Sequence, residues 1–600
     1  MKPVAHLKTW LPGVVALLLV LAVACGVAAP ATAPPTNAPA ATTAPRATSV
    51  PAVTGASVPT ATVAPAATSP AVRPVSAKDN ITLVIDSEPA VLNPLDPLGS
   101  GLVIAMIKDN LVEPLTWQSG DDRRIIPTTA SESWEQLAPD KWRFRLRKGV
   151  KFVNGEAWNA PAALPTAAYQ GVGNNSNSSY PYTGGFKAAA VDEYTLDINC
   201  DLACPILPNT SFFFNFEAPK FYTSASETDL TQKVVGFGPY KLVKWDHGVS
   251  LTEEAYDDYV PVGNHFEFQK PYIRNVRWLW RGESTVQAAM VQAGEADVAW
   301  DVGVDSVKAL PKEMVRSGSS GESFILRPTL LWHPELKKKK VREAIVHAIN
   351  CREIVDNLYA GYTRCLGNII WLGVIGATEQ NTAPYTYDPA LSRQLLKEAN
   401  YNPNNMITIS GRGTRIPKQV EVYEAIQGYL AAVGMNVKVK VVESSIHRNM
   451  RACGIGQAVN DVLLAQGKDP KTAKPTLADM QAAIDKGGAS CPTGDLMEDE
   501  PSNETLDLGR QINFYMNCIR PQSQFCDPSP GGIQEQIAPA LSASGAERQR
   551  LLQAIADWHK ENVVHVPGFE LPVFYAVNPK LNWQPRADRR VKVNSMWFSK

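Results

Sequence analysis

The chain has 600 residues, of which 44% are hydrophobic and 20% are charged, and its 58 basic side chains nearly balance its 59 acidic ones. This length exceeds what one hydrophobic core normally covers, so we expect two or three lobes with the composition of an ordinary globular body. A formal charge of -1 at pH 7 excludes the strongly basic overall field that nucleic-acid binding requires.

The N-terminus, residues 1–25, has the pattern of an export signal. Lys2 and Lys8 precede an apolar run, residues 14–24, and Cys25 follows this run directly. A run of this length is typical of a signal peptide and not of a membrane-spanning helix. A cysteine in this place resembles the lipobox of bacterial lipoproteins, which predicts that Cys25 carries a lipid. The alternative is plain secretion, in which Cys25 is removed with the signal.

Residues 26–78 are rich in alanine, proline and threonine and contain no aromatic or acidic residue. Such a segment cannot bury enough apolar surface to offset the entropy lost on ordering, so the sequence predicts a disordered tether. Because proline-rich chain is stiff, this tether would hold the folded body away from a membrane.

The folded body is predicted to begin with a strand at residues 81–85. Asn159 can cap a short helix, since its side-chain oxygen can accept from a free N–H of the first turn. Farther along the chain, residues 284–293 indicate a helix and residues 296–300 a strand.

The stretch VGFGPYKLVKW, residues 235–245, contains two glycines that could either cradle a phosphate or turn the chain. Pro239 removes an N–H donor where a phosphate loop needs one, and a strand follows in place of a helix. A turn is therefore predicted, in which glycine allows a positive φ or a close backbone approach.

The second half of the chain contains a strand–helix–strand unit. Residues 406–409 and 437–441 indicate strands, and residues 417–432 indicate a helix between them. This is a βαβ unit with its usual right-handed crossover, which gives the α/β class. Upstream, apolar side chains recur three or four positions apart over residues 341–349, as on one buried helix face, and Asn350 can cap the next helix.

Nine cysteines are present, an odd number that would leave one unpaired in an oxidising compartment. If Cys25 carries lipid, eight remain, and we predict that neighbours along the chain pair, although eight cysteines permit many other connectivities. A metal site is disfavoured, because no CxxC motif occurs and no histidine lies beside the cysteines at ligand spacing. The predicted pairs are Cys200–Cys204, Cys351–Cys365, Cys453–Cys491 and Cys518–Cys526.

Several blocks occur in an order that resembles the extracellular solute-binding proteins of the peptide-type family 5, which serve ABC importers. The blocks are Leu111-Val112-Glu113-Pro114-Leu115, residues 144–156, Gly236-Phe237-Gly238-Pro239-Tyr240, residues 341–350 and residues 387–399. The resemblance covers about residues 80 to 600. It departs from the family pattern at Phe237, in the place of a threonine, and at Asn350, in the place of an aspartate.

The resemblance implies an α/β fold of the bilobal periplasmic-binding-protein type (type II), with an extra subdomain inserted in the first lobe. The first lobe is expected to consist of residues 79–118, 230–322 and 560–600. The insertion is expected at residues 119–229 and the second lobe at residues 323–559. The two lobes would close on a ligand about a hinge.

The function implied by the resemblance is capture of a small organic solute or peptide and its delivery to an ABC permease. We expect a monomeric lipoprotein, anchored on the outer face of the bacterial cytoplasmic membrane, that uses no cofactor or metal and has no nucleic-acid partner. The alternatives are a surface receptor or adhesin that does not transport and an exported hydrolase. An enzyme is disfavoured because neither G-x-S-x-G nor H-E-x-x-H occurs; Gly318-Ser319-Ser320-Gly321 does not fit the first motif and is expected to be a loop.

Candidate ligand-binding residues follow predicted strands or lie in polar loops. Arg412 and Arg415 follow the strand at 406–409, in a loop of the kind that faces the crevice of open α/β sheets, and a guanidinium suits a carboxylate ligand. Asp507 stands roughly where peptide-binding members of the family have an aspartate that meets the ligand's amine. The complete set is Glu88, Tyr180, Trp300, Asp301, Arg412, Arg415 and Asp507. Each of these could instead be a solvated loop or core residue.

Overall fold

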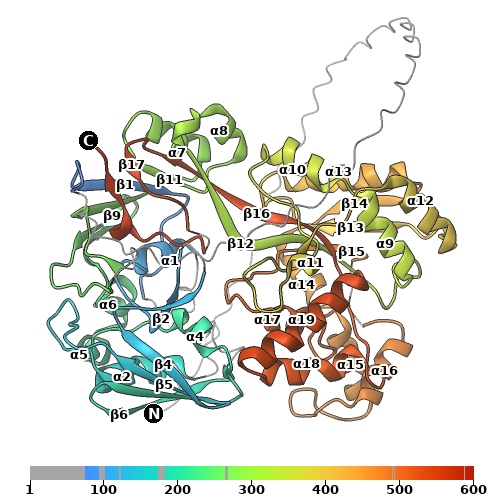
Figure 1. Ribbon diagram of the computed structural model, residues 1–600, viewed down its shortest axis with the longest axis horizontal. Helices are drawn as coiled ribbons and strands as arrows, with labels where there is room; N and C mark the ends of the chain where they lie inside the picture. Colours follow the sequence, from blue (N-terminus) through green and yellow to red (C-terminus); the bar gives the residue numbers. More distant parts are fainter. Residues whose placement is uncertain are drawn as a thin grey trace, which may run out of the picture. The chain divides into compact units, whose positions relative to one another are not determined.

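The computed structural model describes residues 75–93, 102–120, 123–172, 183–263, 268–489, 491, 494–586 and 588–600 (Figure 1). These residues belong to one compact unit, Val72–Lys600. The predicted signal peptide, Cys25, most of the predicted tether and Tyr180 lie outside the described residues. Within the described part, no helix combines the length and apolarity needed to cross a membrane.

A sheet of ten strands runs through the whole unit. Its two central strands, β12 and β16, are long and antiparallel, and each passes from one half of the sheet to the other (Figure 1). We call the half with β1 and β8–β11 the first lobe and the half with β13–β15 the second lobe. The strand order is β14 (Val437–Val441), β13 (Ile407–Gly411), β15 (Leu496–Asp499), β12 (Val315–Pro328), β16 (Val566–Val577), β11 (Val298–Trp300), β1 (Asn80–Ile85), β10 (Asn275–Trp280), β9 (Ser250–Ala255) and β8 (Tyr240–Asp246).

The first strand, β1, shows how the first lobe is built on both faces of the sheet. Ile81, Leu83 and Ile85 point into one apolar core, and Val84 points into another, because side chains alternate along a strand. The core around Val84 is covered by α7 (Ser284–Gln292) and α8 (Val304–Ala309). The helix predicted at 284–293 and the strand at 296–300 are thus confirmed.

The last residues of the predicted tether are ordered. Ala77 N donates to the Phe598 carbonyl at 2.9 Å, and the Lys78 ammonium pairs with Asp297 at 2.8 Å. The prediction that disorder extends to residue 78 is therefore wrong at its end. The composition of the segment could not reveal this order, because a single backbone hydrogen bond and one ion pair require no apolar residues.

A separate four-stranded sheet lies within residues 119–229, the expected insertion. Its order is β4 (Ser131–Ala138), β5 (Lys141–Leu146), β7 (Thr195–Cys200) and β6 (Phe186–Asp192). Helix α2 (Ala160–Gln170) packs on this sheet and begins, as predicted, at Asn159, whose side chain accepts from Ala162 N. The smaller elements nearby are β2 (Thr116–Gln118), β3 (Ile125–Pro127), α4 (Leu207–Thr210), α5 (Pro219–Ser224) and α6 (Glu227–Gln232).

The turn predicted at Gly236 and Gly238 is only a bend at Gly238 and Pro239, and the two glycines are required there by close backbone approach. Gly238 N donates to the Leu111 carbonyl at 2.9 Å. A Cβ on Gly236 would lie 2.2 Å from the Leu111 oxygen, and one on Gly238 would lie 2.5 Å from the Asn110 oxygen, so only glycine fits at either position. Between them Phe237 is buried, with its ring 4.7 Å from that of Trp158.

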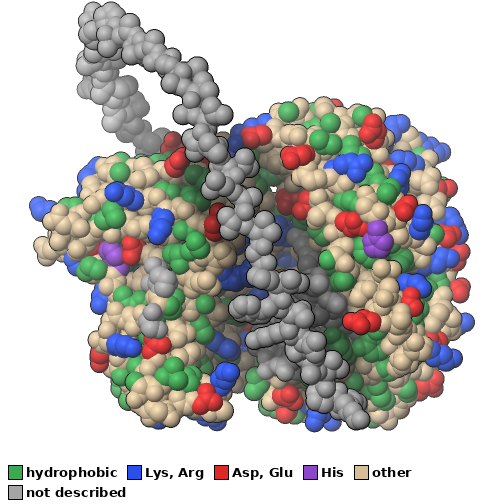
Figure 2. Space-filling view, turned by 180° about the vertical axis from the view of Figure 1, so that it is seen from behind, with side chains coloured by type: hydrophobic (Ala, Val, Ile, Leu, Met, Phe, Trp, Pro, Cys, Tyr) green, Lys and Arg blue, Asp and Glu red, His purple; other side chains and the backbone are tan. Residues whose placement is uncertain are grey.

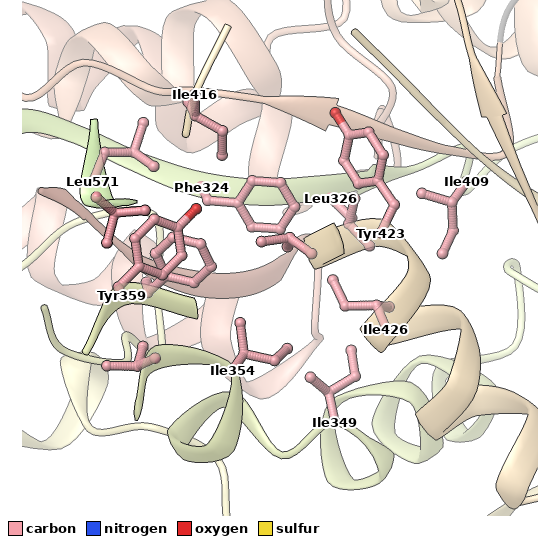
Figure 3. Close-up of a cluster of buried hydrophobic side chains, with 14 of the residues drawn as sticks. Phe324, Leu326, Ile349, Ile354, Tyr359, Ile409, Ile416, Tyr423, Ile426 and Leu571 are labelled. Carbon is pink, nitrogen blue, oxygen red and sulfur yellow. The ribbon is translucent and has the colours of Figure 1, made fainter. Parts of the chain in front are cut away.

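The second lobe is centred on the predicted βαβ unit. Strands β13 and β14 are parallel, and α13 (Gln419–Ala432) connects them. Figure 3 shows the apolar cluster beneath this unit, in which Tyr359, Phe324 and Ile426 point toward one another. The helix face predicted over 341–349 belongs to α9 (Lys339–Ala348), and Asn350 caps α10 (Cys351–Tyr359) by accepting from Glu353 N. The expected cap and helix are confirmed.

Most of the remaining helices lie below the βαβ unit in the view of Figure 1, where they form apolar cores of their own. The remaining helices are α1 (Leu102–Lys108) in the first lobe, and α11 (Glu379–Thr382), α12 (Pro389–Glu398), α14 (Ser444–Arg451), α15 (Ile455–Ala465), α16 (Leu477–Asp485), α17 (Gly509–Tyr515), α18 (Ile533–Ser542) and α19 (Gly545–Glu561) in the second. Two short strands near the C-terminus, β17 (Leu581–Asn582) and β18 (Trp597–Phe598), pair with each other.

The eight predicted disulfide cysteines lie in pairs at bonding distance. The four pairs are Cys200–Cys204, Cys351–Cys365, Cys453–Cys491 and Cys518–Cys526, with Cα–Cα distances of 6.4, 6.0, 5.8 and 5.0 Å. The last pair lies in a small apolar core with α15 and α16. Cross-links of this kind compensate for the modest size of that core.

The segment from Gly318 to Gly321 is not a loop. It lies within β12, where the pairing with β16 shifts register between Ser319 and Ser323. Gly321 has a φ of +74°, which is the conformation that glycine adopts at such irregularities. Serine and glycine are common both in turns and in irregular strands, so these residues alone could not distinguish the two.

Candidate functional site

A cavity of about 580 Å³ lies where β12 passes between the lobes. Figure 2 shows the hollow between the two halves of the described chain, with acidic and basic side chains at its edges. The first lobe contributes the ends of β1 and β11, part of α1 and the segment after residue 587; the second contributes the loops after β13 and β15. A cavity of several hundred cubic ångströms is the usual size for a small organic ligand.

Glu322 stands at the centre of the charged wall. Its carboxylate accepts from Arg415 Nη2 at 3.0 Å and from Arg589 Nη1 at 3.2 Å. Arg415 belongs to the second lobe and Arg589 to the C-terminal segment of the first, so one carboxylate on the crossing strand joins cations from both sides. The irregularity of β12 just before Glu322 is a device that commonly re-aims a side chain toward a site.

Asp301 supplies an acidic group that no described residue engages by a hydrogen bond. It follows β11 with a φ of +57°, which is unusual for a residue other than glycine. Its carboxyl is open to the cavity yet surrounded by protein. Burial raises its pKa, and Arg589 and Arg415 partly oppose that rise.

Two further arginines line the cavity. Arg123 places its guanidinium 5.2 Å from the ring of Trp371, and burial lowers its pKa against the opposing charge of Glu570. Arg590 pairs with Asp109 at 2.8 Å. The cavity therefore holds guanidinium groups on several walls, and such forks suit carboxylate or phosphate groups of a ligand.

The segment that carries Arg589 and Arg590 is held by buried charges behind it. Lys592 is fully buried and lies 3.4 Å from Glu113, which also accepts from the Tyr259 hydroxyl at 3.0 Å. Burial raises the pKa of Glu113 to about 7, although Lys592 opposes the rise. These contacts fix the backbone and so present the two arginines to the cavity.

Aromatic rings form the apolar part of the lining. Phe212 and Phe213 lie with their ring centroids 4.0 Å apart, and Trp117 and Trp300 also line the cavity. The Arg589 guanidinium lies 5.9 Å from the centroid of the Trp300 ring. The cavity can therefore hold a ligand with an apolar body and charged ends.

Four of the seven predicted ligand-binding residues line this cavity. They are Glu88, Trp300, Asp301 and Arg415. The Glu88 carboxylate also has partners in the first lobe, because it accepts from Trp245 Nε1 at 2.8 Å and from Gly248 N at 3.1 Å.

Arg412 and Asp507 are not among the described residues that line the cavity, and Tyr180 lies outside the described residues. Arg412 Nη2 donates to Glu498 at 2.8 Å and also contacts Glu500, whose pKa is raised by burial and by its neighbour Glu498. Asp507 is buried and pairs with Arg548 through two 2.6 Å hydrogen bonds. Both predicted ligand residues are thus occupied by partners within the second lobe.

Sequence reasoning missed Glu322 and the arginines at 123, 589 and 590. The stretch from Arg586 to Lys592 has a run of basic residues that could have drawn attention. Nothing in the sequence, however, places that stretch beside β12 or the loop of Arg415. Glu322 lies in the segment that we expected to be near a loop, where an acidic residue is unremarkable.

Comparisons with known proteins give a consistent result. The profile described as "Bacterial extracellular solute-binding proteins, family 5 Middle" matches residues 124–473. The glutathione-binding protein GsiB of Escherichia coli (strain K12) is 28% identical over 330 residues, which are 53% of this chain and 61% of that relative.

Solved structures show a similar fold. The ABC transporter substrate-binding protein CtaP from Listeria monocytogenes has a TM-score of 0.70 at 16% identity, over 87% of this chain and 100% of that one. A nickel ABC transporter protein from Bacillus halodurans has a TM-score of 0.66 at 18% identity, over 86% and 100%. At these identities the likeness concerns the fold alone.

Proposed function

This chain belongs to the bacterial extracellular solute-binding proteins of family 5, and we propose that it captures a small solute with carboxylate and amine groups for an ABC importer. One observation carries the proposal. The cavity between the lobes brings Arg415 and Arg589 together on Glu322, with Asp301 on the same cavity. A zwitterionic or peptide-like compound has complementary charges for both kinds of group.

The carboxylate of such a solute would meet the guanidinium groups. Arg589 suits this role because its Nε is buried and has no hydrogen-bond partner among the described residues. A buried donor without a partner is costly, so an anionic ligand that accepted this hydrogen bond would be favoured.

The amine of the solute would meet Asp301. A cation beside the carboxylate would stabilise its ionised form and reverse the effect of burial on its pKa. Binding of the amine and deprotonation of Asp301 would therefore support each other.

Capture would depend on closure of the two lobes on the solute. In the present structure Asn209 of the insertion donates to the Thr505 carbonyl of the second lobe at 2.9 Å, and Gln118 of the first lobe donates to the Glu504 carbonyl. A ligand that contacts both walls favours this arrangement over a more open one, and the shift is as large as the difference in its affinity for the two.

The similarity to GsiB makes glutathione the first compound to test, since that relative is named for binding it. The match spans only about three-fifths of the relative, so the same ligand is a proposal for this chain. Glutathione has two carboxylates and one amine, which agrees with the charges of the cavity.

The predicted anchor and transport partner complete the proposal. A lipid on Cys25 and the tether after it would hold the monomer at the outer face of the cytoplasmic membrane, beside the permease that receives the solute. The receptor or adhesin and the exported hydrolase remain the competing functions.

Native mass spectrometry of protein purified from its host tests the proposal most directly. We expect a retained small molecule that is released unchanged on denaturation. Isothermal titration then measures the affinity for that molecule, or for glutathione as the first probe. Asp301→Asn should weaken binding at least tenfold, and Glu424→Gln, which also removes one negative charge but from an exposed residue of α13 that does not line the cavity, serves as the charge control.

Other outcomes would favour a competing function. Consumption of the bound molecule over time would indicate a hydrolase. Normal uptake of that molecule by a strain that lacks this chain would favour a receptor. Equal affinity of wild type and Asp301→Asn would remove Asp301 from the binding site.

A further inference from the structure

A second cavity, of about 290 Å³, lies between the insertion and the second lobe. One wall is formed by the loop closed by the Cys200–Cys204 pair and the residues just after it, and the other is formed mainly by α17 and α18. Its lining contains apolar groups, three arginines and one asparagine. Among the described residues that line it there is no carboxylate.

The three arginines differ in how they are occupied. Arg548 is held by Asp507 and by the carbonyls of Ala540 and Leu541. Arg510 is paired with Glu504. Arg520 makes no ion pair with any residue that the structure describes, and its Nε donates to Asn513 at 3.3 Å. Arg520 is an exposed residue at the edge of the cavity, and the protein around its guanidinium lowers its pKa without an opposing carboxylate.

One ion pair links the lining of this cavity to that of the cavity between the lobes. Glu504 lines the larger cavity, and its partner Arg510 lines the smaller one. The side chains of this pair are 36% and 28% exposed, and such half-exposed pairs are readily exchanged for other partners. The hydrogen bond from Asn209 to the Thr505 carbonyl lies at the same boundary.

We propose that the second cavity is an anion subsite for the far end of an elongated solute. A solute held in the larger cavity would extend past Glu504, place its apolar part against Ile206 and Phe514, and present a terminal carboxylate or phosphate to Arg520. Arg510 would then exchange Glu504 for the anion of the solute. The proposal rests on the proposed function in that it assigns the larger cavity to the same solute.

Matched pairs of peptides test the subsite in the full-length protein. Peptides of two to six residues are each prepared as the free acid and as the C-terminal amide, and isothermal titration gives both dissociation constants. For lengths that reach the subsite, wild type should prefer the acid at least tenfold. Arg520→Gln should reduce this preference to below twofold and leave the affinity for the amides unchanged.

Arg448→Gln is the control, because it removes an exposed arginine that lines neither cavity, and it should retain the preference for the acid. An Arg520→Lys variant should keep part of the preference, since it retains the charge but not the planar fork. An acid preference that is the same in wild type and Arg520→Gln at every length would overturn the inference.

A second measurement separates this inference from the proposed function. Benzoate and phenyl phosphate are too short to span both cavities, and each carries one anion on an apolar ring. We expect that at least one of them slows hydrogen exchange of α17 in wild type and not in Arg520→Gln. The two probes also distinguish a carboxylate site from a phosphate site.

If no peptide binds but a ring anion protects α17, the subsite stands and the peptide-like solute of the proposed function fails. If peptides bind without an acid preference and neither ring anion protects α17, the proposed function stands and the subsite is refuted. If no peptide binds and neither ring anion protects α17, the subsite is refuted as well.

Discussion

Two groups of ion pairs in this molecule use the same kinds of side chain in different surroundings. Asp507 and Arg548 are almost fully buried in the second lobe, with side-chain exposures of 0% and 4%. Glu322 and Arg415, on the wall of the cavity, are 17% and 38% exposed. The buried pair is closed to a solute in the larger cavity, although Arg548 also lines the smaller one, whereas the Glu322–Arg415 pair can exchange a partner for a solute. The difference indicates that the first pair stabilises the fold, and the second is the pair to which the proposed function assigns binding.

Asp507→Ala tests the buried side of this comparison and should have the largest effect. It leaves Arg548 as a buried charge without its carboxylate, which typically lowers the free energy of unfolding by about 3–5 kcal/mol. Chemical denaturation followed by circular dichroism measures the loss. The affinity of the folded variant for a solute that fits within the larger cavity, such as glutathione, should not change; a large loss of this affinity at unchanged stability would instead place Asp507 in the binding site.

Acid sensitivity provides a second test of buried charge. His559 Nε2 and His565 Nδ1 lie 2.7 Å apart in the second lobe, and burial lowers the pKa of His559 to about 3 and that of His565 well below its usual value. In the unfolded chain the two histidines become protonated near pH 6.5, whereas in the folded chain they stay neutral to a much lower pH. Their contribution to the free energy of unfolding is therefore fully present above pH 6.5. It should fall by up to about 1.4 kcal/mol per pH unit and per proton as the pH decreases toward 3.

Unfolding curves measured between pH 7 and pH 4 check this prediction. His559→Gln should be less stable than wild type at pH 7 but should show a shallower loss on acidification. Equal slopes for the two proteins would show that other groups cause the acid sensitivity.

Glu322→Gln tests the cavity side and should have the smallest effect on stability, within about 1 kcal/mol, because both of its pairs are partly exposed. Its effect on binding should be clearer. Removing the carboxylate that occupies Arg415 and Arg589 should strengthen binding of an anionic solute by about tenfold, which is about 1.4 kcal/mol. Titration with the solute identified by mass spectrometry measures this change. Weaker binding would mean that Glu322 itself contacts a cationic part of the solute.

The βαβ unit and the helix caps could be predicted because they depend on local patterns. The side-chain oxygens of Asn159 and Asn350 bond to N–H groups within three residues of them, so the sequence alone contains both partners. The irregular strand at Gly318–Gly321 could not be predicted in this way, since its conformation depends on pairing with β16.

Arg412 and Arg415 show the limit of sequence reasoning at the candidate site. They follow the same strand, three positions apart, and the same argument predicted both to face the crevice. Only Arg415 does so, because Glu498 and Glu500 at the end of β15 hold Arg412 inside the second lobe. The neighbouring strand, which decides between them, lies more than eighty residues away in the chain.

The sequence by itself determined the α/β class and the order of the blocks that resemble family 5, since both depend on local periodicity, spacing or composition. It suggested the pairing of neighbouring cysteines without excluding other connectivities, and the folded chain brings these four pairs to bonding distance. The tertiary structure alone decided which charges meet. Glu322 from a crossing strand, Arg415 from the second lobe and Arg589 from the C-terminal segment come together because β12 and β16 pass side by side between the lobes. The local sequence around a charged side chain does not reveal which residue it will pair with. Only the folded chain therefore shows whether each charge lies in the interior or on the cavity.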